Sequence, residues 1–154
     1  MGSFHQLAYH IVFGTKYRKP WITGDAQPRL YEYIGGIIRG IKGHLIEIGG
    51  VADHVHILAN CSPTIALSDA IRTVKANSSK WIHDEKLFSE TFAWQTGYGA
   101  FTVSYSQVPT VQKYIQNQEP HHREFSFTDE YTKLLTRHGI AFKREFLFED
   151  EFHG

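Results

Sequence analysis

The sequence has little cysteine, no long hydrophobic run and no net charge. Its one cysteine, Cys61, excludes an intrachain disulfide framework and a zinc site built from thiolates. No apolar stretch approaches the roughly 18 residues of a membrane-spanning helix, so we expect no membrane partner. The N-terminal residues lack the basic and then apolar order of a secretion signal, and the sequence therefore predicts a cytoplasmic protein.

The absence of net charge conceals an uneven distribution. The 16 basic and 16 acidic side chains cancel, which by itself argues against a nucleic-acid-binding domain. Residues 1–118, however, carry 11 basic and 8 acidic side chains, a net of +3, whereas residues 119–154 carry 5 and 8, a net of −3. The sequence thus predicts a basic body followed by an acidic C-terminal segment. With 154 residues and 42% hydrophobic side chains, the chain fits one domain with a real core.

The hydrophobic pattern alternates between strand and helix periods along the chain. Strands are expected at residues 7–15, 44–48, 54–60 and 92–104, and helices at 28–40, 67–84, 110–121 and 125–142. Pro120 is expected to end the third of these helices. The order predicts an α+β, ferredoxin-like split βαβ sandwich, with helices on one face of an antiparallel sheet and a C-terminal helical extension. Such a fold hosts many functions and does not identify one.

The segment His54-Val55-His56 lies in a predicted strand. Residues two apart in a strand point to the same face, so both imidazoles can reach one metal ion while Val55 points into the core. The alternative is a pair of half-exposed histidines on a polar sheet face, because a chain with ten histidines contains His-x-His by chance. The motif alone leaves both interpretations open.

Tyr114 and Gln118 are four residues apart in a predicted helix and should project side by side. A glutamine carbonyl can bind a hard cation, and a tyrosine beside it can act as a covalent nucleophile. The alternative is an ordinary amphipathic helix with a half-buried tyrosine and a solvated glutamine. The sequence identifies no general base. His10, His44, His121 and His122 are candidates that structural or solvated roles would equally explain.

Taken together, the two motifs and their surroundings resemble the single-tyrosine transposases of the HUH endonuclease superfamily. These are the transposases of insertion sequences of the 200/605 type, and they include REP-associated tyrosine transposases. The histidine pair around an apolar residue matches the motif that names the superfamily. Further matching segments are residues 9–13, 15–18, 50–53, 57–58, 94–95, 97–101, 103–104, 114–115, 117–119 and 121–122. The resemblance spans nearly the whole chain, in order.

This resemblance implies one HUH-type transposase domain over residues 1–154, with a core at about 5–122 and an extension at about 123–154. His54, His56 and Gln118 would be the metal ligands, and Tyr114 would be the nucleophile. The ligands would hold Mg²⁺ or Mn²⁺, of which imidazole favours the latter. The enzyme would cleave and rejoin hairpin-bearing single-stranded DNA through a 5′-phosphotyrosine intermediate.

The resemblance also implies partners and DNA contacts. Family enzymes are homodimers in which the tyrosine helix can complete the site of the other subunit. The DNA on which the protein acts would be that of the nucleoid. Phosphate contacts are expected from basic and hydroxyl side chains, with a solvated surface as the alternative for each. The candidates are Lys16, Arg18, Lys19, Arg72, Lys75 and Ser78.

Two other functions remain open. The chain could be a catalytically silent or domesticated hairpin-DNA-binding protein, or a small metal-dependent hydrolase in which Tyr114 is incidental. For the acidic segment we expect packing away from the DNA path or against a partner subunit. A structure in which residues 129–151 line the groove beside His54 and His56 would overturn that expectation. The small basic excess predicts a shallow salt dependence of DNA binding.

Overall fold

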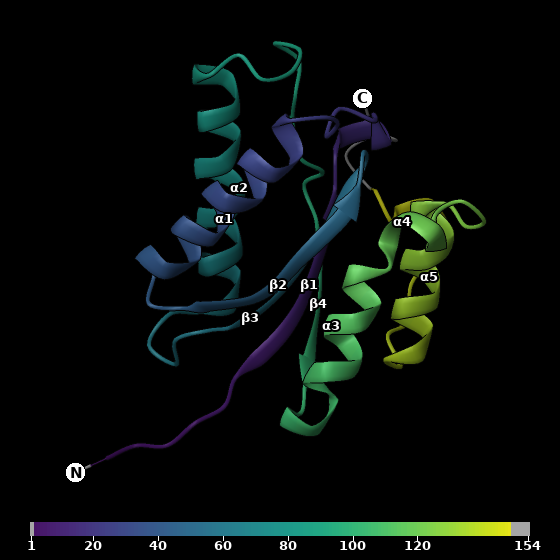
Figure 1. The fold of residues 1–154 in the computed structure, drawn as a ribbon. Helices are drawn as coiled ribbons and strands as arrows, with labels where there is room; N and C mark the ends of the chain where they lie inside the picture. Colours follow the sequence, from purple (N-terminus) through teal and green to yellow (C-terminus); the bar gives the residue numbers. More distant parts are fainter. Residues whose placement is uncertain (1, 149–154) are drawn as a thin grey trace.

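A four-stranded antiparallel sheet with the order β2-β3-β1-β4 forms the centre of the molecule (Figure 1). The computed structural model describes residues 2–148. The strands are β1 (Ala8–Gly14), β2 (His44–Val51), β3 (His54–Asn60) and β4 (Gly99–Val103). The helices are α1 (Ala26–Gly40), α2 (Leu67–Asp84), α3 (Val108–Gln116), α4 (Gln118–His121) and α5 (Phe127–Arg137). Short 3₁₀ turns lie at Lys16–Arg18, Tyr105–Gln107 and Arg144–Phe146.

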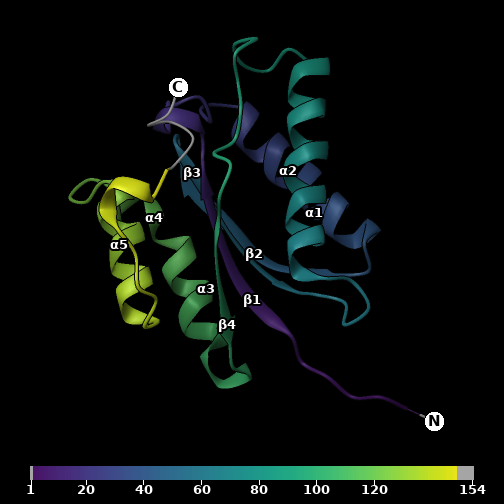
Figure 2. The same ribbon diagram turned by 180° about the vertical axis from the view of Figure 1, so that it is seen from behind.

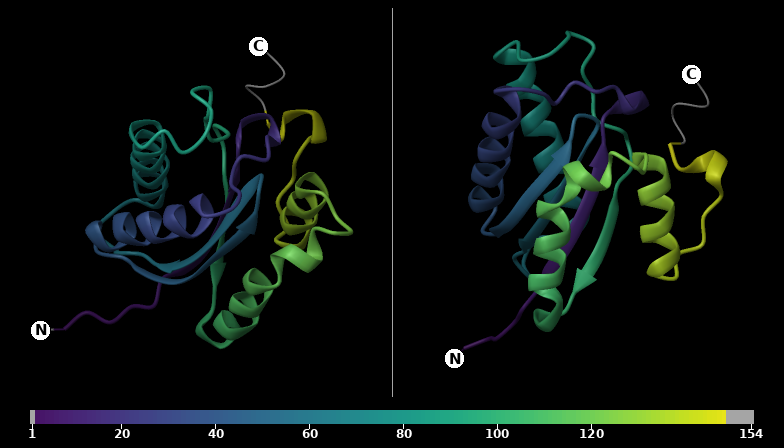
Figure 3. Two further views of the ribbon diagram at one scale, coloured as in Figure 1. Left: turned by 45° about the horizontal axis from the view of Figure 1, so that its top comes forward. Right: turned by 45° about the vertical axis from the view of Figure 1, so that its right-hand side comes forward.

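The two faces of the sheet carry different residues because side chains alternate along a strand. Phe13, Val55 and Ile57 point to the face that α1 and α2 cover, and they belong to the larger hydrophobic core. Their neighbours His54 and His56 therefore point to the opposite face. Figures 2 and 3 show α1 and α2 on one side of the sheet and α3, α4 and α5 on the other.

The ferredoxin-like core agrees with the sequence prediction. The order β1-α1-β2-β3-α2-β4 is the split βαβ arrangement, and both of its helices lie on one face of the sheet. The predicted bounds of β3 and α2 match those observed. The C-terminal helices go beyond the prediction, because they cover the second face of the sheet. No helix within residues 2–148 combines the length and the apolar content needed to cross a bilayer.

Two glycines allow the C-terminal helices to approach the sheet closely. A Cβ atom on Gly49 of β2 would lie 2.7 Å from the carbonyl oxygen of Ile115 in α3. A Cβ atom on Gly14 of β1 would lie 2.6 Å from the ring of Phe127 in α5. Real Cβ atoms do not approach other atoms this closely, so glycine at both positions sets the distance of these helices from the sheet.

Three predictions about local structure were wrong. The helix expected at 110–121 is broken at Asn117, which has φ −100° and ψ 23°, so Gln118 begins the short helix α4. Pro120 does not end a helix but lies in the first turn of α4. Backbone N–H groups in a first turn have no partner within the helix, so the missing N–H of proline costs no hydrogen bond there. The strand expected at 92–104 shortens to Gly99–Val103, and before it only an isolated bridge pairs Trp94 with Thr15 among the described residues.

Candidate active site

His54 and His56 lie side by side on the face of β3 that α3, α4 and α5 cover. Both residues are fully buried. The burial overturns the alternative of half-exposed histidines on a polar face. A buried imidazole needs hydrogen-bonding partners, and each of these two rings has them on both nitrogens. The pair is therefore part of a closed polar cluster beneath the C-terminal helices.

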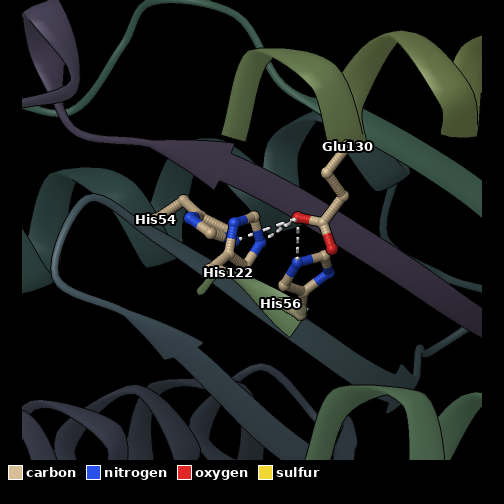
Figure 4. A group of neighbouring side chains, drawn as sticks. All are labelled: His54, His56, His122 and Glu130. Carbon is tan, nitrogen blue, oxygen red and sulfur yellow. Dashed lines mark hydrogen bonds and ion pairs between the residues drawn. The ribbon is translucent and has the colours of Figure 1, made fainter. Parts of the chain in front are cut away.

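Glu130 of α5 is the centre of that cluster (Figure 4). Its Oε1 atom lies 3.0 Å from Nε2 of His54, 2.9 Å from Nε2 of His56 and 3.0 Å from Nε2 of His122. The Glu130 side chain is 1% exposed, so its charge is taken out of water. Burying a carboxylate is costly unless positive groups and hydrogen-bond donors compensate for the lost hydration.

Tyr114 and Gln118 face the other carboxylate oxygen of Glu130. The amide of Gln118 donates to Oε2 at 2.9 Å, and the Tyr114 hydroxyl donates to the same oxygen. The Oε1 atom of Gln118 also lies 3.1 Å from Nε2 of His54. One chain thus brings together the four residues predicted for the site, although the helix between Tyr114 and Gln118 is broken. Gln118 is buried rather than solvated.

Two further residues orient the histidine rings from outside. A carboxylate oxygen of Asp53 lies 2.7 Å from Nδ1 of His54, and Nε2 of His10 lies 2.8 Å from Nδ1 of His56. A hydrogen bond to the outer nitrogen of an imidazole fixes the ring and directs the inner nitrogen. Both Nε2 atoms consequently point toward Glu130.

The histidine pKa values diverge within the cluster. Burial lowers the pKa of His56 to about 4 and that of His10 to about 3, and the hydrogen bond of His56 to Glu130 compensates only in part. Burial opposes the charged form of His54 as well, but its hydrogen bonds to Asp53 and Glu130 outweigh burial and raise its pKa to about 9. The cluster therefore combines neutral rings with one that favours the charged form.

The pKa values of the Glu130 carboxyl group and the Tyr114 hydroxyl group shift in opposite directions. Burial would raise the pKa of Glu130, but hydrogen bonds from His122, His54 and His56 hold it far below its usual range. Burial and the nearby Glu130 carboxylate raise the pKa of Tyr114. In this arrangement Glu130 is charged and the Tyr114 hydroxyl keeps its proton.

The donor atoms of the cluster suit a divalent metal ion. One ligand atom from each of His54, His56, His122 and Glu130 lies within 4.8 Å of the others. Imidazole nitrogens together with carboxylate and amide oxygens are ligands of Mn²⁺ and similar ions, while Mg²⁺ prefers oxygen alone. The residues present therefore fit a divalent ion of the kind that the resemblance implies, Mg²⁺ or Mn²⁺, with imidazole favouring Mn²⁺.

The prediction for the acidic segment was wrong. Residues from the −3 segment lie directly against the histidines, because the Phe127 ring stacks on His54 with centroids 4.2 Å apart and Glu130 contacts both histidines. Phe127 and Tyr131 of α5 pack with Val12 and Phe101 of the sheet, which fixes the helix over β1 and β4. The predicted residues 149–151 lie outside the described part of the chain.

Two of the residues predicted to contact DNA have other roles. The prediction for Ser78 was wrong, because its hydroxyl is buried and bonds the carbonyl of Val74 and the indole of Trp94. The Lys75 ammonium group donates to the backbone carbonyls of Gln95, Thr96 and Gly97, and so holds the segment before β4.

The other four predicted contacts lie at the surface on two elements. Arg72 is 72% exposed and pairs with Asp69 at 3.0 Å on α2, across the sheet from the histidines. The remaining three follow β1, in a turn that begins where the Thr15 amide donates to the carbonyl of Asp53. There the cations of Lys16, Arg18 and Lys19 lie over the rings of Tyr17, Phe148 and Trp21. This turn brings positive charge to the end of the sheet that carries Asp53.

Glu130 and the roles of Asp53, His10 and His122 were not found from the sequence, where the last two were only candidate bases. One signal was present. Ser126 caps α5 by accepting from the amide of Asp129 at 3.1 Å, a pattern readable in sequence. Counting from that cap, Glu130 falls between Phe127 and Leu134 on the buried helix face. The buried face of an amphipathic helix is normally apolar, so a carboxylate there indicates a specific hydrogen-bonding or charged partner.

The fold and the meeting of His54, His56, Tyr114 and Gln118 agree with the class that the sequence resemblance implied, the single-tyrosine transposases. The family described as "Transposase IS200 like" matches residues 3–118, and the chain belongs to this family. The ISDra2 transposase TnpA of Deinococcus radiodurans is 29% identical over 123 residues, which cover 76% of this chain and 87% of that protein. The transposase for insertion sequence element IS200 of Salmonella typhimurium is 28% identical over 120 residues, covering 71% and 75%.

Solved structures share the fold. A crystal structure from Deinococcus radiodurans R1, of a protein assigned as a transposase, superposes with a TM-score of 0.62 at 23% identity and covers 77% of this chain and 95% of that one. A REP-associated tyrosine transposase bound to a REP hairpin superposes with a TM-score of 0.60 at 12% identity, covering 79% and 74%. The family match ends at residue 118, so His122 and Glu130 lie beyond it.

Proposed function

We propose that this transposase cleaves and rejoins single-stranded DNA through a covalent link to Tyr114, at a metal site formed by His54, His56 and Gln118. The observation that carries the proposal is the meeting of these residues in one buried cluster. The rings of Tyr114 and His56 have centroids 5.7 Å apart, and Gln118 bonds His54. A phenol placed beside imidazole and amide ligands is the constellation that metal-assisted phosphoryl transfer needs.

The reaction would proceed by transesterification at a phosphodiester. The Tyr114 oxygen attacks the phosphorus, the new P–O bond forms as the P–O3′ bond breaks, and a free 3′-hydroxyl and a 5′-phosphotyrosine result. A bound divalent ion would stabilise charge on the phosphate oxygens. The link conserves the phosphodiester bond energy, so the 3′-hydroxyl of another strand can reverse the step without a nucleotide cofactor.

The proton of Tyr114 needs an acceptor as the bond to phosphorus forms. A phenol with a pKa near ~10 is weakly nucleophilic at neutral pH, and here the pKa is raised further. The Glu130 carboxylate already accepts the Tyr114 hydrogen bond, but its lowered pKa makes it a weak base, so the contact orients the hydroxyl more than it removes the proton. Among the candidate bases named from sequence, His10 instead bonds His56.

An open cleft of about 500 Å³ has Tyr114 in its lining. Most of its walls come from β4, α3 and α5, and Ser104, Thr110 and Arg137 also line it. These are phosphate-binding side-chain types. We propose that this cleft receives the strand to be cut. The hairpin-bound tyrosine transposase supports a hairpin substrate. From the family resemblance we also propose that the protein acts as a homodimer on nucleoid DNA.

The test uses labelled single-stranded hairpin DNA taken from the sequence that flanks the encoding gene. Incubation with Mn²⁺ should give a covalent protein–DNA band on a denaturing gel. The band should vanish with EDTA and in Tyr114→Phe, because the variant lacks the attacking oxygen. Tyr105→Phe is the matched control, since Tyr105 is 79% exposed and lies outside the cluster; it should behave as the unmodified protein.

The other outcomes of this assay identify the alternatives. Cleavage without a covalent band, retained in Tyr114→Phe, would mean a metal-dependent hydrolase. A mobility shift on a native gel without any cleavage would mean a hairpin-binding protein without chemistry. Either result would refute the proposed strand transfer.

A further inference from the structure

We propose that His122 and Glu130, which lie beyond the part of the chain that matches the family, are also metal ligands. The site would then hold its ion with three imidazoles and one carboxylate in addition to Gln118. The inference rests on the proposed function, because it concerns the same ion, and it adds the C-terminal segment as a source of ligands. Nothing in the matched residues 3–118 supplies a third histidine or a carboxylate to this point.

The first support is convergence. The Nε2 atoms of His54, His56 and His122 come from β3 and from the end of α4, yet all three lie 2.9–3.0 Å from a single oxygen of Glu130. Figure 4 shows the four side chains pointing to a common centre. Three ring nitrogens and a carboxylate that share one point form a chelating set.

The second support is the direction of the outer nitrogens. Nδ1 of His54 lies 2.7 Å from a carboxylate oxygen of Asp53, and Nδ1 of His122 lies 2.6 Å from the carbonyl oxygen of Phe125. Both partners can only accept, so both Nδ1 atoms carry hydrogen. In a neutral ring the Nε2 atom then has a lone pair, and it is directed at the Glu130 oxygen.

Two acceptors facing each other at 3.0 Å attract only when a proton or a cation lies between them. A single proton can satisfy one Nε2 atom at a time. A divalent cation can satisfy all three nitrogens and the carboxylate together, and it offsets the charge of Glu130, whose side chain is 1% exposed. Metal-bound histidines carry this same outer hydrogen bond from Nδ1 to a carboxylate or carbonyl.

The extended ligand set changes the expected choice of metal. Two imidazoles and an amide oxygen leave room for Mg²⁺ with several waters, whereas three imidazoles favour first-row transition metals. The added imidazole of His122 therefore predicts a clear preference for Mn²⁺ over Mg²⁺. This preference should weaken in His122→Ala, whereas the Glu130 carboxylate is a ligand that suits both ions.

Metal binding to the full-length, metal-free protein tests the inference without an activity assay. Mn²⁺ is titrated in, and free Mn²⁺ is followed by its EPR signal. We expect Glu130→Gln and His122→Ala to weaken Mn²⁺ binding by at least about 10- to 100-fold, the loss typical of disturbed ligand shells. Glu119→Gln removes the same charge from a side chain that is 80% exposed, and it should bind Mn²⁺ as the unmodified protein does.

The outcomes separate this inference from the proposed function. Unchanged Mn²⁺ binding in Glu130→Gln and His122→Ala, with binding lost in the double variant His54→Ala, His56→Ala, would overturn the inference and leave the proposed site standing. No Mn²⁺ binding by the unmodified protein would refute both. If a variant fails to fold, pulsed EPR on the Mn²⁺-loaded unmodified protein decides, because it counts bound nitrogens. Three imidazoles support the inference, and two overturn it.

Discussion

Glu130 Oε1 lies 2.9 Å from Nε2 of His56, although the two residues are 74 positions apart. This contact joins α5 to β3 through the middle of the candidate active site. It means that the chemistry of the histidine pair cannot be separated from the C-terminal segment.

Tyr114 should serve the histidines of its own chain. Its hydroxyl and His56 of the same chain both bond Glu130, so an active site needs no residue from a second subunit. Mixing Tyr114→Phe with His56→Ala and allowing subunits to exchange should therefore restore no covalent product on a denaturing gel. Activity in the mixture, but in neither variant alone, would instead place the tyrosine in the partner's site.

Gly49→Ala should displace α3, the helix that carries Tyr114, the proposed nucleophile. Its Cβ atom would meet the Ile115 carbonyl oxygen at 2.7 Å, and Ile115 is next to Tyr114. Overpacking of this kind costs about 1–3 kcal/mol, measurable by urea unfolding. A shift of roughly 1 Å can cost about 10²-fold in rate, so we also expect slower adduct formation.

Gly40→Ala is the matched control for this substitution. Gly40 ends α1, and a Cβ atom there meets no atom within 4 Å. The stability of Gly40→Ala should equal or slightly exceed that of the unmodified protein, because alanine favours a helix over glycine. Its rate of adduct formation should be unchanged. Equal behaviour of the two variants would show that the close approach of α3 to β2 does not position Tyr114.

The stability of the metal-free protein should be greatest near neutral pH. The pKa of His56 is lowered from 6.5 to about 4, so its contribution is complete above pH 6.5 and is lost as the pH falls toward 4. The pKa of His54 is raised from 6.5 to about 9, so its contribution is complete below 6.5 and is lost as the pH rises toward 9. Urea unfolding in EDTA between pH 4 and 9 should therefore give a maximum.

A variant of His56 assigns the acidic limb of that profile. His56→Gln should flatten the decrease of the unfolding free energy between pH 6.5 and 4, because it removes the shifted group. His44→Gln replaces an exposed histidine at the start of β2 and should leave the profile unchanged. A decrease below pH 6.5 that persists undiminished in His56→Gln would mean that this ring is not the source.

Lys75→Met should destabilise the fold but leave the salt dependence of DNA binding unchanged. The variant removes the donor that holds the carbonyls of Gln95, Thr96 and Gly97, at a cost of about 1 kcal/mol for a partly exposed charged group. Thermal unfolding measures the loss. The slope of DNA affinity against salt should not change, whereas a phosphate contact would reduce that slope by about 1.

Arg72→Met is the comparison on the same helix. Arg72 is 72% exposed and its ion pair with Asp69 is a surface pair, which contributes little to stability. Its thermal unfolding should match that of the unmodified protein. A greater loss of stability in Arg72→Met than in Lys75→Met would contradict the roles that the structure gives these two side chains.

The local hydrophobic pattern was enough to predict the strands and helices in which apolar side chains recur at a regular spacing. The alternation around His54 and His56 placed both rings on one face, and the apolar spacing of α2 gave its bounds. The break at Asn117 could not be predicted, because helical periodicity continues through it. After the break, Gln118 reaches the long-range partners His54 and Glu130, which local spacing does not reveal.

Glu130 was missed for a different physical reason. Counting charges over residues 119–154 treats every carboxylate as solvated, and the sum of −3 hides the one whose side chain is 1% exposed. Its two partners on β3, His56 and His54, lie 74 and 76 residues earlier in the chain, far outside any local window. The apolar neighbours Phe127 and Leu134 were the available sign that this position faces inward.

The contact between Gly14 and Phe127 has a consequence for the history of the chain. The Phe127 ring occupies the space of a Cβ atom on residue 14, so a larger residue at position 14 and an aromatic ring at position 127 do not fit together in the observed packing. Homologues that acquire a larger residue at the position of Gly14 should lose the aromatic residue at that of Phe127. Where the two positions covary in this way, the C-terminal helix has been inherited as part of the catalytic domain.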